Sequence, residues 1–426
     1  MEPKQTLTVD EIDLSDIEFW SLPLEEREGA FKTLREERPL PFYEEPDLGI
    51  DWIPKGPGYY AVTRHADILA ASKQPEIFSS AQGATGINDM PAEFLEFFGS
   101  MINMDDPRHT RLRRIVAAGF TPKMLRQVEE SVQRSAADIV DGVLGKGECD
   151  FVTEVAAKLP LKIICDMMGI PASDYETVFS RSNVILGAGD PEYVPEGADL
   201  AAALLSAGSE LAQMVGELGE LRKRHPTDDL TSALINASVD GEHLTPQELG
   251  SFFILLVVAG NETTRNAISH GLEQLTLNPD QRAMWAADFD GVAPTAVEEI
   301  VRWATPVVWM RRTATRDAEL GGRPIKEGDK FLLFYNSANR DDAVFAEPYR
   351  FDVRRQPNDH VGFGGPGPHF CLGAHLARRE ITVMFRELFR RVPDIEATGD
   401  PARLRSSFIN GIKHLPCSFT AGGKAA

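Results

Sequence analysis

Cysteine is scarce in this chain, and no hydrophobic run is long enough to cross a membrane. The four cysteines, Cys149, Cys165, Cys371 and Cys417, form no CxxC motif and no regular series, which argues against a disulfide framework and favours a reducing cytoplasm. The most apolar stretch, residues 252–260, lies in an uncharged window from Leu249 to Asn261. That window is shorter than the ~18 apolar residues that a membrane span needs. The first residues show no basic patch followed by an apolar run, so we expect no signal peptide.

Basic residues are also fewer than acidic residues. The chain has 44 Lys and Arg against 65 Asp and Glu, a formal net charge of −21, whereas a nucleic-acid-binding surface needs a basic footprint. With 42% hydrophobic and 26% charged residues, the composition is that of a folded globular protein. We therefore expect a soluble, cytoplasmic protein that binds no nucleic acid and has no membrane span.

The hydrophobic pattern predicts a mainly α-helical protein with a minor β part. Residues 107–224 are mostly helical in pattern, with breaks expected at residues 145–147, Pro160, Pro171 and residues 190–195. Thr245, Pro246 and Glu248 form a helix start with a capping box. This helix is expected to run for ~30 residues, to Asn278-Pro279, and its apolar middle indicates burial.

Shorter elements are expected downstream. We predict a helix over residues 295–304 and strands over residues 307–310, 318–320 and 330–335. A long loop over residues 339–368 follows, and ordered loops of this length are often functional. It ends near Cys371, where another helix is expected to begin at once. Helices and strands do not alternate as in a doubly wound fold. Residues 1–426 are expected to form one domain, with residues 1 to about 55 as an extension packed on it.

The segment FGGPGPHFCLG, residues 363–373, is rich in glycine around one cysteine. Glycine lets a backbone approach a flat, bulky group closely, and a helix N-terminus lowers the pKa of a nearby thiol. A stiff loop that presents one thiolate suits axial ligation of haem iron by Cys371. From this segment alone, an inert buried cysteine is an equally good interpretation, and a zinc site of His369, Cys371 and His375 is a weaker one.

Polar residues interrupt the long apolar helix at Ala259-Gly260-Asn261-Glu262-Thr263-Thr264. Glycine costs ~1 kcal/mol relative to alanine inside a helix, and a buried carboxylate is unfavourable unless it is paired or used. An acid and a hydroxyl here would suit the delivery of protons to bound oxygen. The alternative is that the helix simply emerges into solvent at this point.

Other charged residues gain meaning only in combination. Glu299 and Arg302 are i,i+3 neighbours, which is worth little on a surface. If buried, the pair needs further hydrogen bonds, which Arg350 could supply. Four basic side chains suit carboxylates such as the haem propionates, although each alone would be read as a surface charge: His109, Arg113, Arg312 and His369.

Taken in order, these motifs resemble the cytochrome P450 haem-thiolate monooxygenases. The order is HxxxR at residues 109–113, AGNETT at 259–264, ExxR at 299–302, RTATRD at 312–317, EPYRF at 347–351 and the Cys loop. The resemblance covers about residues 58–416 and implies a single, mainly helical domain with a small β-rich part. One departure is that Phe363 lies eight residues before Cys371, where the family pattern has seven.

The resemblance implies a role for each motif residue. Cys371 would be the axial thiolate of haem b, Glu262 and Thr263 would serve oxygen activation, and Glu299, Arg302 and Arg350 would form a structural triad behind the haem. The residues implied to contact the cofactor are His109, Arg113, Ala259, Gly260, Arg312, Phe363, Gly364, His369 and Gly373.

The implied reaction inserts one oxygen atom of O2 into a C–H bond. Electrons would come from NAD(P)H through a separate reductase, so a ferredoxin and a ferredoxin reductase are the expected partners. Arginines at positions 108, 111, 113, 114, 378 and 379 are expected to attract an acidic ferredoxin. A haem-binding sensor without turnover, or an isomerising haem enzyme, is the alternative, and the Glu262–Thr263 pair argues against both.

Within the family, the chain is similar to actinobacterial enzymes that hydroxylate the ends of methyl-branched lipids and of cholesterol-type side chains. The expected substrate is a hydrophobic lipid with a methyl-branched or isoprenoid-like chain, attacked at its terminal carbon; a steroid side chain is the alternative. The predicted pocket residues are Ile87, Phe98, Leu255, Val258, Val307, Val308, Trp309 and Phe408.

Overall fold

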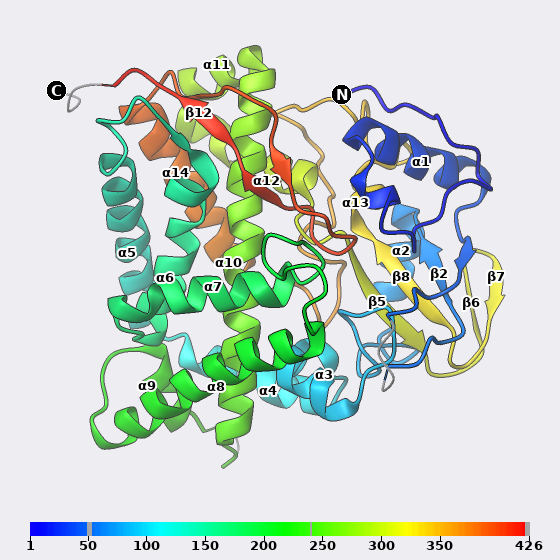
Figure 1. Ribbon diagram of the computed structural model, residues 1–426, viewed down its shortest axis with the longest axis horizontal. Helices are drawn as coiled ribbons and strands as arrows, with labels where there is room; N and C mark the ends of the chain where they lie inside the picture. Colours follow the sequence, from blue (N-terminus) through cyan, green and yellow to red (C-terminus); the bar gives the residue numbers. More distant parts are fainter. Residues whose placement is uncertain (49–52, 239–240, 422–426) are drawn as a thin grey trace.

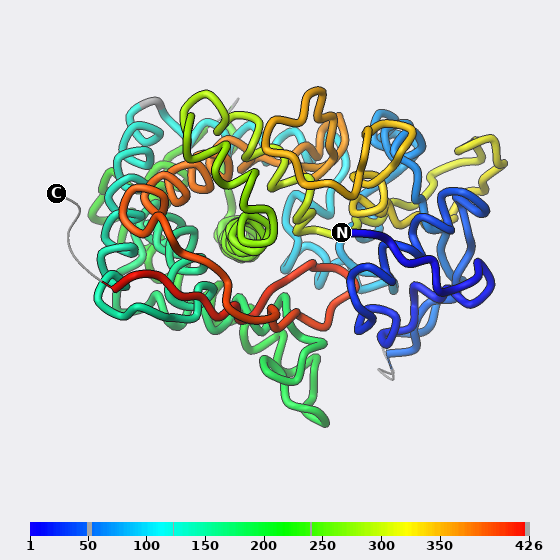
Figure 2. The backbone as a smooth tube through the Cα atoms, turned by 90° about the horizontal axis from the view of Figure 1, so that it is seen from above, coloured from blue at the N-terminus to red at the C-terminus, as the bar shows by residue number. Residues whose placement is uncertain are grey.

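One long helix runs through the centre of the molecule. The computed structural model describes residues 1–48, 53–238 and 241–421. Helix α10 (Pro246–Leu277, 32 residues) is surrounded by other elements, and Figure 2 views it nearly along its axis. Its N-terminus is a capping box, because Thr245 Oγ1 accepts from the Glu248 N–H (3.1 Å) and Glu248 accepts from the Thr245 N–H (2.8 Å). The predicted start, length and burial of this helix are confirmed.

Helices make up most of the described chain. Several of them pack directly against α10 (Figure 1): α3 (Ala92–Gly99), α6 (Lys158–Met168), α7 (Tyr175–Leu186), α8 (Leu200–Arg224), α12 (Phe289–Ala304) and α14 (Ala374–Arg391). The remaining α-helices are α1 (Leu24–Glu37), α2 (His65–Ser72), α4 (Arg108–Gly119), α5 (Pro122–Asp141), α9 (Leu230–Asn236), α11 (Pro279–Ala287) and α13 (Tyr335–Ala338). Short 3₁₀ turns cover Phe19–Ser21, Ser100–Asn103 and Ala172–Asp174, and a π-helical turn covers Val152–Ala156.

The main sheet lies beside the helical part (Figure 1). It has the order β1-β2-β8-β5-β3, formed by Phe42–Tyr43, Tyr59–Val62, Lys330–Phe334, Trp309–Ala314 and Phe78–Ser79. A three-stranded sheet joins β4 (Glu148–Asp150), β12 (Pro416–Ser418) and β9 (Glu396–Ala397). Two hairpin-like pairs complete the set: β10 (Ala402–Arg403) with β11 (Ile412–His414), and β6 (Ala318–Leu320) with β7 (Arg323–Ile325). The predicted fold class, mainly α with a minor β part, is confirmed.

The N-terminal segment packs on the main sheet. Trp20 and Phe31 share one hydrophobic cluster with Trp309 and Phe334 of β5 and β8. The Trp20 and Phe334 rings stack with their centroids 6.2 Å apart. The segment therefore belongs to the same core as strands nearly three hundred residues away in the sequence, which is consistent with one domain.

Several predicted boundaries were wrong, each for a local reason. Helix α12 begins at Phe289 and not at residue 295, because Asp288 caps it by accepting from the Gly291 N–H (3.1 Å) and Pro294 is accommodated inside it. Pro160 does not break α6, because it lies in the first turn, where the missing N–H has no helical partner in any case. Helix α14 begins at Ala374, three residues after Cys371. Strand β5 starts two residues later than expected, where its register with β8 begins.

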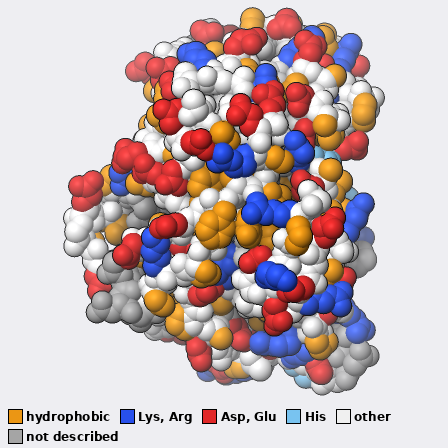
Figure 3. All heavy atoms as spheres, turned by 90° about the vertical axis from the view of Figure 1, so that its right-hand side faces the viewer, with side chains coloured by type: hydrophobic (Ala, Val, Ile, Leu, Met, Phe, Trp, Pro, Cys, Tyr) orange, Lys and Arg blue, Asp and Glu red, His pale blue; other side chains and the backbone are white. Residues whose placement is uncertain are grey.

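The surface mixes both signs of charge. On the face that carries the β part, acidic, basic and hydrophobic side chains are interspersed (Figure 3). The net negative charge therefore does not form one continuous acidic surface on that face. Among the described residues, no helix is long and apolar enough to span a membrane.

Packing around α10 can be tested with two glycines. A Cβ at Gly271 of α10 would lie 2.6 Å from Phe385 Cζ, whereas a Cβ at Gly216 of α8 would meet nothing within 4 Å. We expect Gly271→Ala to destabilise the protein by about 1–3 kcal/mol through overpacking. Gly216→Ala should stabilise it by about 0.5–1 kcal/mol through helix propensity. Urea unfolding followed by circular dichroism measures both, and a shift of both variants in the same direction would contradict the described packing.

Candidate functional site

The loop that carries Cys371 is closed by a backbone hydrogen bond and pressed against α2. The Cys371 N–H donates to the Phe363 carbonyl (3.0 Å). Gly364 and Gly367 have positive φ values of 86° and 145°, which favour glycine. A Cβ at Gly365 would lie 2.4 Å from Ser72 Oγ of α2. The expectation that all these glycines serve a flat ligand is therefore corrected, because Gly365 and Gly367 are needed for the approach to α2.

The Cys371 thiol lies in mixed surroundings. Burial is the largest influence and raises its pKa, while the N–H groups of Gly373 and Ala374 and the charges of Arg113 and Arg378 act in the opposite direction. The predicted net lowering of the pKa is thus wrong for the free thiol, although the predicted N–H donors are present. Among the described residues, no three His, Cys, Asp or Glu side chains form a group that could hold a metal ion, so the zinc alternative lacks its ligands.

Arg113 braces this loop from α4. Its Nη1 donates to the Pro368 carbonyl (2.9 Å) and its Nη2 to the Phe370 carbonyl (2.7 Å). These two carbonyls flank His369, so the guanidinium fixes the backbone just before Cys371. Arg113 was expected to face a propionate, and in this structure its donors are engaged by the loop instead.

Three side chains that can carry positive charge converge beside the Cys loop. The rings of His109 and His369 lie 4.3 Å apart, and Arg312 and His369 line a small cavity of about 20 Å³. Burial, and then the charges of Arg312 and His109, lower the pKa of His369 to about 3. Burial also lowers the pKa of His109 and of Arg312. His109 Nδ1 has no hydrogen-bond partner among the described residues, and the Asp106 carboxylate is 3.8 Å from it. The cluster is short of negative charge.

This cluster fits the carboxylates of haem b. A bound anion would supply acceptors to His109 Nδ1 and Arg312 and would raise the pKa of both histidines. His369 of this cluster lies two residues before Cys371 in the loop, so one group could meet the thiol with its iron and the cluster with its propionates. The predicted set of His109, Arg312 and His369 is therefore brought together in space.

The face of α10 that carries the AGNETT motif is open. Leu255, Ala259 and Thr263 follow each other at intervals of four residues and so lie along one face of the helix. Ala259 is exposed and the other two are half-buried, in a helix whose other residues are mostly buried. Thr263 Oγ1 donates to the Ala259 carbonyl (2.7 Å). A Cβ at Gly260 would lie 2.7 Å from Ile164 Cδ1, so that glycine serves the packing of α10 on α6.

Glu262 is engaged on another side of α10. Its carboxylate forms a buried ion pair with Arg265 and accepts from Asn266 Nδ2 (3.1 Å). Arg265 also donates to Asn183 of α7 (3.1 Å). The acid and the hydroxyl of the expected pair are adjacent in sequence, but the structure does not bring them together. A role for Glu262 in proton delivery stays a prediction and requires the carboxylate to leave Arg265.

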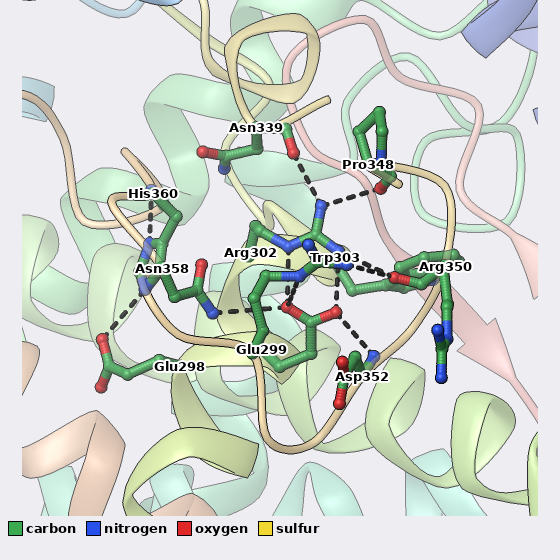
Figure 4. Close-up of polar contacts among 12 residues, drawn as sticks. Glu298, Glu299, Arg302, Trp303, Asn339, Pro348, Arg350, Asp352, Asn358 and His360 are labelled. Atoms are coloured by element: carbon green, nitrogen blue, oxygen red, sulfur yellow. Dashed lines mark hydrogen bonds and ion pairs between the residues drawn. The ribbon is translucent and has the colours of Figure 1, made fainter. Parts of the chain in front are cut away.

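A buried ion pair fastens the long loop to α12. Glu299 and Arg302 are fully buried and bound through two contacts of 2.7 Å each. Arg302 Nη1 also donates to the carbonyls of Asn339 (2.8 Å) and Pro348 (2.9 Å). The Glu299 carboxylate accepts from the Asp352 N–H (2.9 Å). Figure 4 shows these bonds converging on the loop from one turn of α12.

The third member of this network is Arg355, so the prediction of Arg350 was wrong. Arg355 Nε donates to Glu299 Oε2 (3.1 Å), and its two Nη atoms bind loop carbonyls. Arg350 contributes its backbone oxygen to Arg302 (3.3 Å; Figure 4). Its exposed side chain pairs with Glu347. A signal existed in the sequence, because Arg354-Arg355 follows the EPYRF motif.

Glu298 of α12 provides a second set of contacts between this helix and the region of the Cys loop. It accepts from His360 (2.9 Å) and makes a two-point contact with Arg378 of α14 (2.5 and 2.9 Å). Burial alone would raise the Glu298 pKa, but these partners outweigh burial and lower it to about 2. The Arg378 guanidinium lies 4.4 Å from the centre of the Phe363 ring. This contact places Phe363 under α14 despite the extra residue in the loop.

The arginines expected to attract a ferredoxin are largely neutralised. Arg111 pairs with Glu248 (2.6 Å), and Arg108 with Glu96 (2.9 Å). Arg379, by contrast, is exposed. The basic surface near the Cys loop is therefore weaker than the sequence suggested.

The predicted pocket residues divide between two hydrophobic clusters. Phe98, Leu255 and Val258 are half-buried beside the core of α4, α6, α8 and α10. The others lie on the side of the main sheet, where the Trp309 and Phe408 rings are 4.9 Å apart: Ile87, Val307, Val308, Trp309 and Phe408. Val308 and Trp309 are buried in the core, so contact of these two with a ligand stays a prediction.

The corrected network can be tested with a matched pair of arginines. Arg355→Ala leaves the buried Glu299 carboxylate short of a donor and is expected to destabilise the protein by about 1–3 kcal/mol. Arg350→Ala removes only an exposed ion pair and should change stability by less than about 0.5 kcal/mol. Thermal unfolding of both variants, with haem retention as a second readout, gives the comparison. An equal loss in both, or a larger loss in Arg350→Ala, would restore the original prediction.

Comparisons with known proteins agree with this arrangement. A family model described as Cytochrome P450 matches residues 210–392. The methyl-branched lipid omega-hydroxylase of Mycobacterium tuberculosis is 50% identical over 421 residues, 98% of this chain and 97% of that protein. The steroid C26-monooxygenase of Mycolicibacterium smegmatis is 40% identical over 95% of this chain and 92% of that protein.

The fold is matched as well. A solved cytochrome P450 structure from Mycobacterium marinum, in complex with pseudoionone, has a TM-score of 0.90 and 46% sequence identity, and the match covers 96% of this chain and 98% of that one. The sequence and the fold thus match cytochrome P450 proteins over nearly the whole chain. The chain therefore belongs to the cytochrome P450 family and is a monooxygenase.

Proposed function

We propose that this protein hydroxylates the terminal carbon of a long, methyl-branched lipid with haem b as cofactor. The observation that carries the proposal is the 50% identity, over 98% of the chain, to a methyl-branched lipid omega-hydroxylase. The steroid C26-monooxygenase relative, at 40% identity, makes a steroid side chain the second candidate. The ligand named for the Mycobacterium marinum structure, pseudoionone, is itself a branched isoprenoid ketone.

Different residues of the site are proposed to bind different parts of the cofactor. When bound, haem b supplies the iron at which O2 is activated for insertion into a C–H bond. Cys371 would bind the iron through its thiolate, and His109, Arg312 and His369 would bind the propionates. The Glu299–Arg302–Arg355 network holds the loop that leads to Cys371, so that the thiol keeps one position.

Thr263 of α10 is proposed to guide protons to the site. Its hydroxyl lies on the open face of α10 and bonds to a helix carbonyl (2.7 Å), which orients the oxygen lone pairs away from the helix. A water molecule held there could pass protons to the reacting oxygen. Glu262 can renew those protons once it separates from Arg265.

Terminal hydroxylation requires positioning, because a terminal C–H bond is stronger than an internal one. The pocket must hold the chain end near the iron and keep the inner methylenes away. The apolar residues on and beside the open face of α10, among them Leu255, Val258 and Ala259, would line such an approach. A buried branch methyl contributes about 0.8 kcal/mol, which corresponds to about fourfold in affinity.

The electrons are proposed to come from NAD(P)H through a ferredoxin reductase and a ferredoxin in the cytoplasm. Phe370 and Leu372, on either side of Cys371, are 39% and 40% exposed. They offer a small apolar surface beside the thiol in the chain, and the exposed Arg379 lies on the second turn of α14. A partner docking there would be close to the ligand sulfur.

The role of Thr263 is tested by Thr263→Ala. We expect haem and substrate binding to stay unchanged, while more of the NAD(P)H consumed yields peroxide and less yields product, because proton delivery is impaired. The measurement is the ratio of product to NAD(P)H consumed, with Thr276→Ala, a threonine that also bonds a carbonyl of α10, as the control. Full coupling in Thr263→Ala would remove the proposed role.

The proposed function is tested by product analysis with chains of equal length. With ferredoxin, ferredoxin reductase and NAD(P)H, we expect terminal hydroxylation and a preference of about fourfold for methyl-branched over linear chains. Omission of ferredoxin should abolish turnover. Predominant in-chain products, or equal turnover of both chain types, would contradict the proposal. Preferred turnover of a cholesterol-type side chain would favour the second candidate.

A further inference from the structure

Two of the four cysteines, Cys149 and Cys417, face each other across a pair of strands outside the Cys loop. Strand β12 pairs with β4 in antiparallel register, with Cys417 directly opposite Cys149. Their Sγ atoms are 3.5 Å apart. Backbone bonds fix this register on both sides, from the Phe151 N–H to the Leu415 carbonyl and from the Phe419 N–H to the Gly147 carbonyl, each 2.9 Å. The two thiols are therefore held in contact by the sheet.

The backbone geometry suits a covalent link. Residues directly opposite in an antiparallel pair have Cα atoms about 4.5–5.5 Å apart, which lies within the range of about 4.4–6.8 Å that a disulfide accepts. Rotation of the side chains is then sufficient to bring the sulfurs to bonding distance. Cys149 is half-buried, so a small oxidant reaches it, whereas Cys417 is 2% exposed.

We propose that Cys149 and Cys417 form a redox-sensitive pair that hydrogen peroxide converts to a reversible disulfide. The Cys149 sulfur attacks one peroxide oxygen, the O–O bond breaks, and a sulfenic acid and one water result. The Cys417 thiol then attacks the sulfenic sulfur, an S–S bond forms, and a second water leaves. In total, two thiols are oxidised, one peroxide is reduced, and two waters are formed.

The electrostatics agree with this order of steps. The hydrogen bond between the two thiols is the largest influence on Cys149 and lowers its pKa. Lys146 acts in the same direction, whereas burial and the carboxylates of Glu154 and Asp150 oppose it. The same bond and burial raise the pKa of Cys417. Cys149 is also the more exposed of the two thiols, so it is the nucleophile and Cys417 the resolving thiol. Cys165, by contrast, is fully buried and its pKa is raised by burial to about 12, so it should resist the oxidant.

The disulfide would link the C-terminal strand β12 to strand β4. The two residues are 268 positions apart, so the disulfide closes a very long loop and restricts the unfolded chain. Leu415, Cys417 and Phe419 belong to the main hydrophobic core, and His414 beside them contacts Asp150 (2.5 Å). Oxidation should therefore stabilise the C-terminal strand without changing its register.

The test is a peroxide titration of the haem-loaded enzyme, followed by alkylation of the unfolded protein, digestion and mass spectrometry. We expect a Cys149–Cys417 cross-linked peptide, lighter by two hydrogen atoms, that dithiothreitol reverses. The midpoint of thermal unfolding should rise by about 5 °C on oxidation. The same rise is expected in the control Cys165→Ala and no rise in Cys149→Ser.

Two results would overturn the proposal. One is recovery of both thiols in alkylated form, and the other is Cys149 as a sulfinic acid with Cys417 still free. The cross-link is read in the wild-type protein and does not depend on a variant that folds. If Cys149→Ser fails to fold, Cys417→Ala serves as the second variant, in which Cys149 should react without forming a cross-link.

Discussion

The site depends on one buried ion pair. Glu299 and Arg302 lie fully inside the protein, where an unpaired charge would be strongly unfavourable. The hydrogen-bonding capacity that remains is used to bind loop backbone at residues 339, 348, 350 and 352. A loop with little secondary structure is thereby fixed to a rigid helix, and the Cys loop follows directly from it. Arg113 and Glu298 then hold the segments next to Cys371 from α4 and α12.

The side chains expected to bind the haem carboxylates lie together, but their cluster is short of the negative charge that would balance the positive charge they can carry. His109, His369 and Arg312 gather where burial disfavours positive charge. An anion there would reverse this, because each histidine would gain an opposite charge and its pKa would rise. Cofactor binding and stability are therefore coupled, since a group that binds only the folded state stabilises it. Haem bound here would be oriented by this cluster, because its carboxylates would meet His109, Arg312 and His369.

Much of this could be predicted from the sequence. The capping box at Thr245, the buried long helix, the cysteine loop and the Glu299–Arg302 pair all follow from local chemistry or from motif order. Arg350 was misassigned because a motif shows which segment contributes and not whether the side chain or the backbone oxygen does so; only the fold reveals that Arg355 reaches Glu299. Likewise, the glycines at 365 and 367 serve α2, which is three hundred residues away in sequence and gives no local signal.

The most direct test of the account is whether Cys371 ligates the iron. In the reduced carbon monoxide complex, the wild-type protein is expected to show the red-shifted absorbance band of thiolate-ligated haem. Cys371→Ser should lose that band while the fold, followed by circular dichroism, persists. Cys165→Ala should keep it, because Cys165 is buried in the core of α6. A Cys371→Ser protein that retains the red-shifted band would contradict the account.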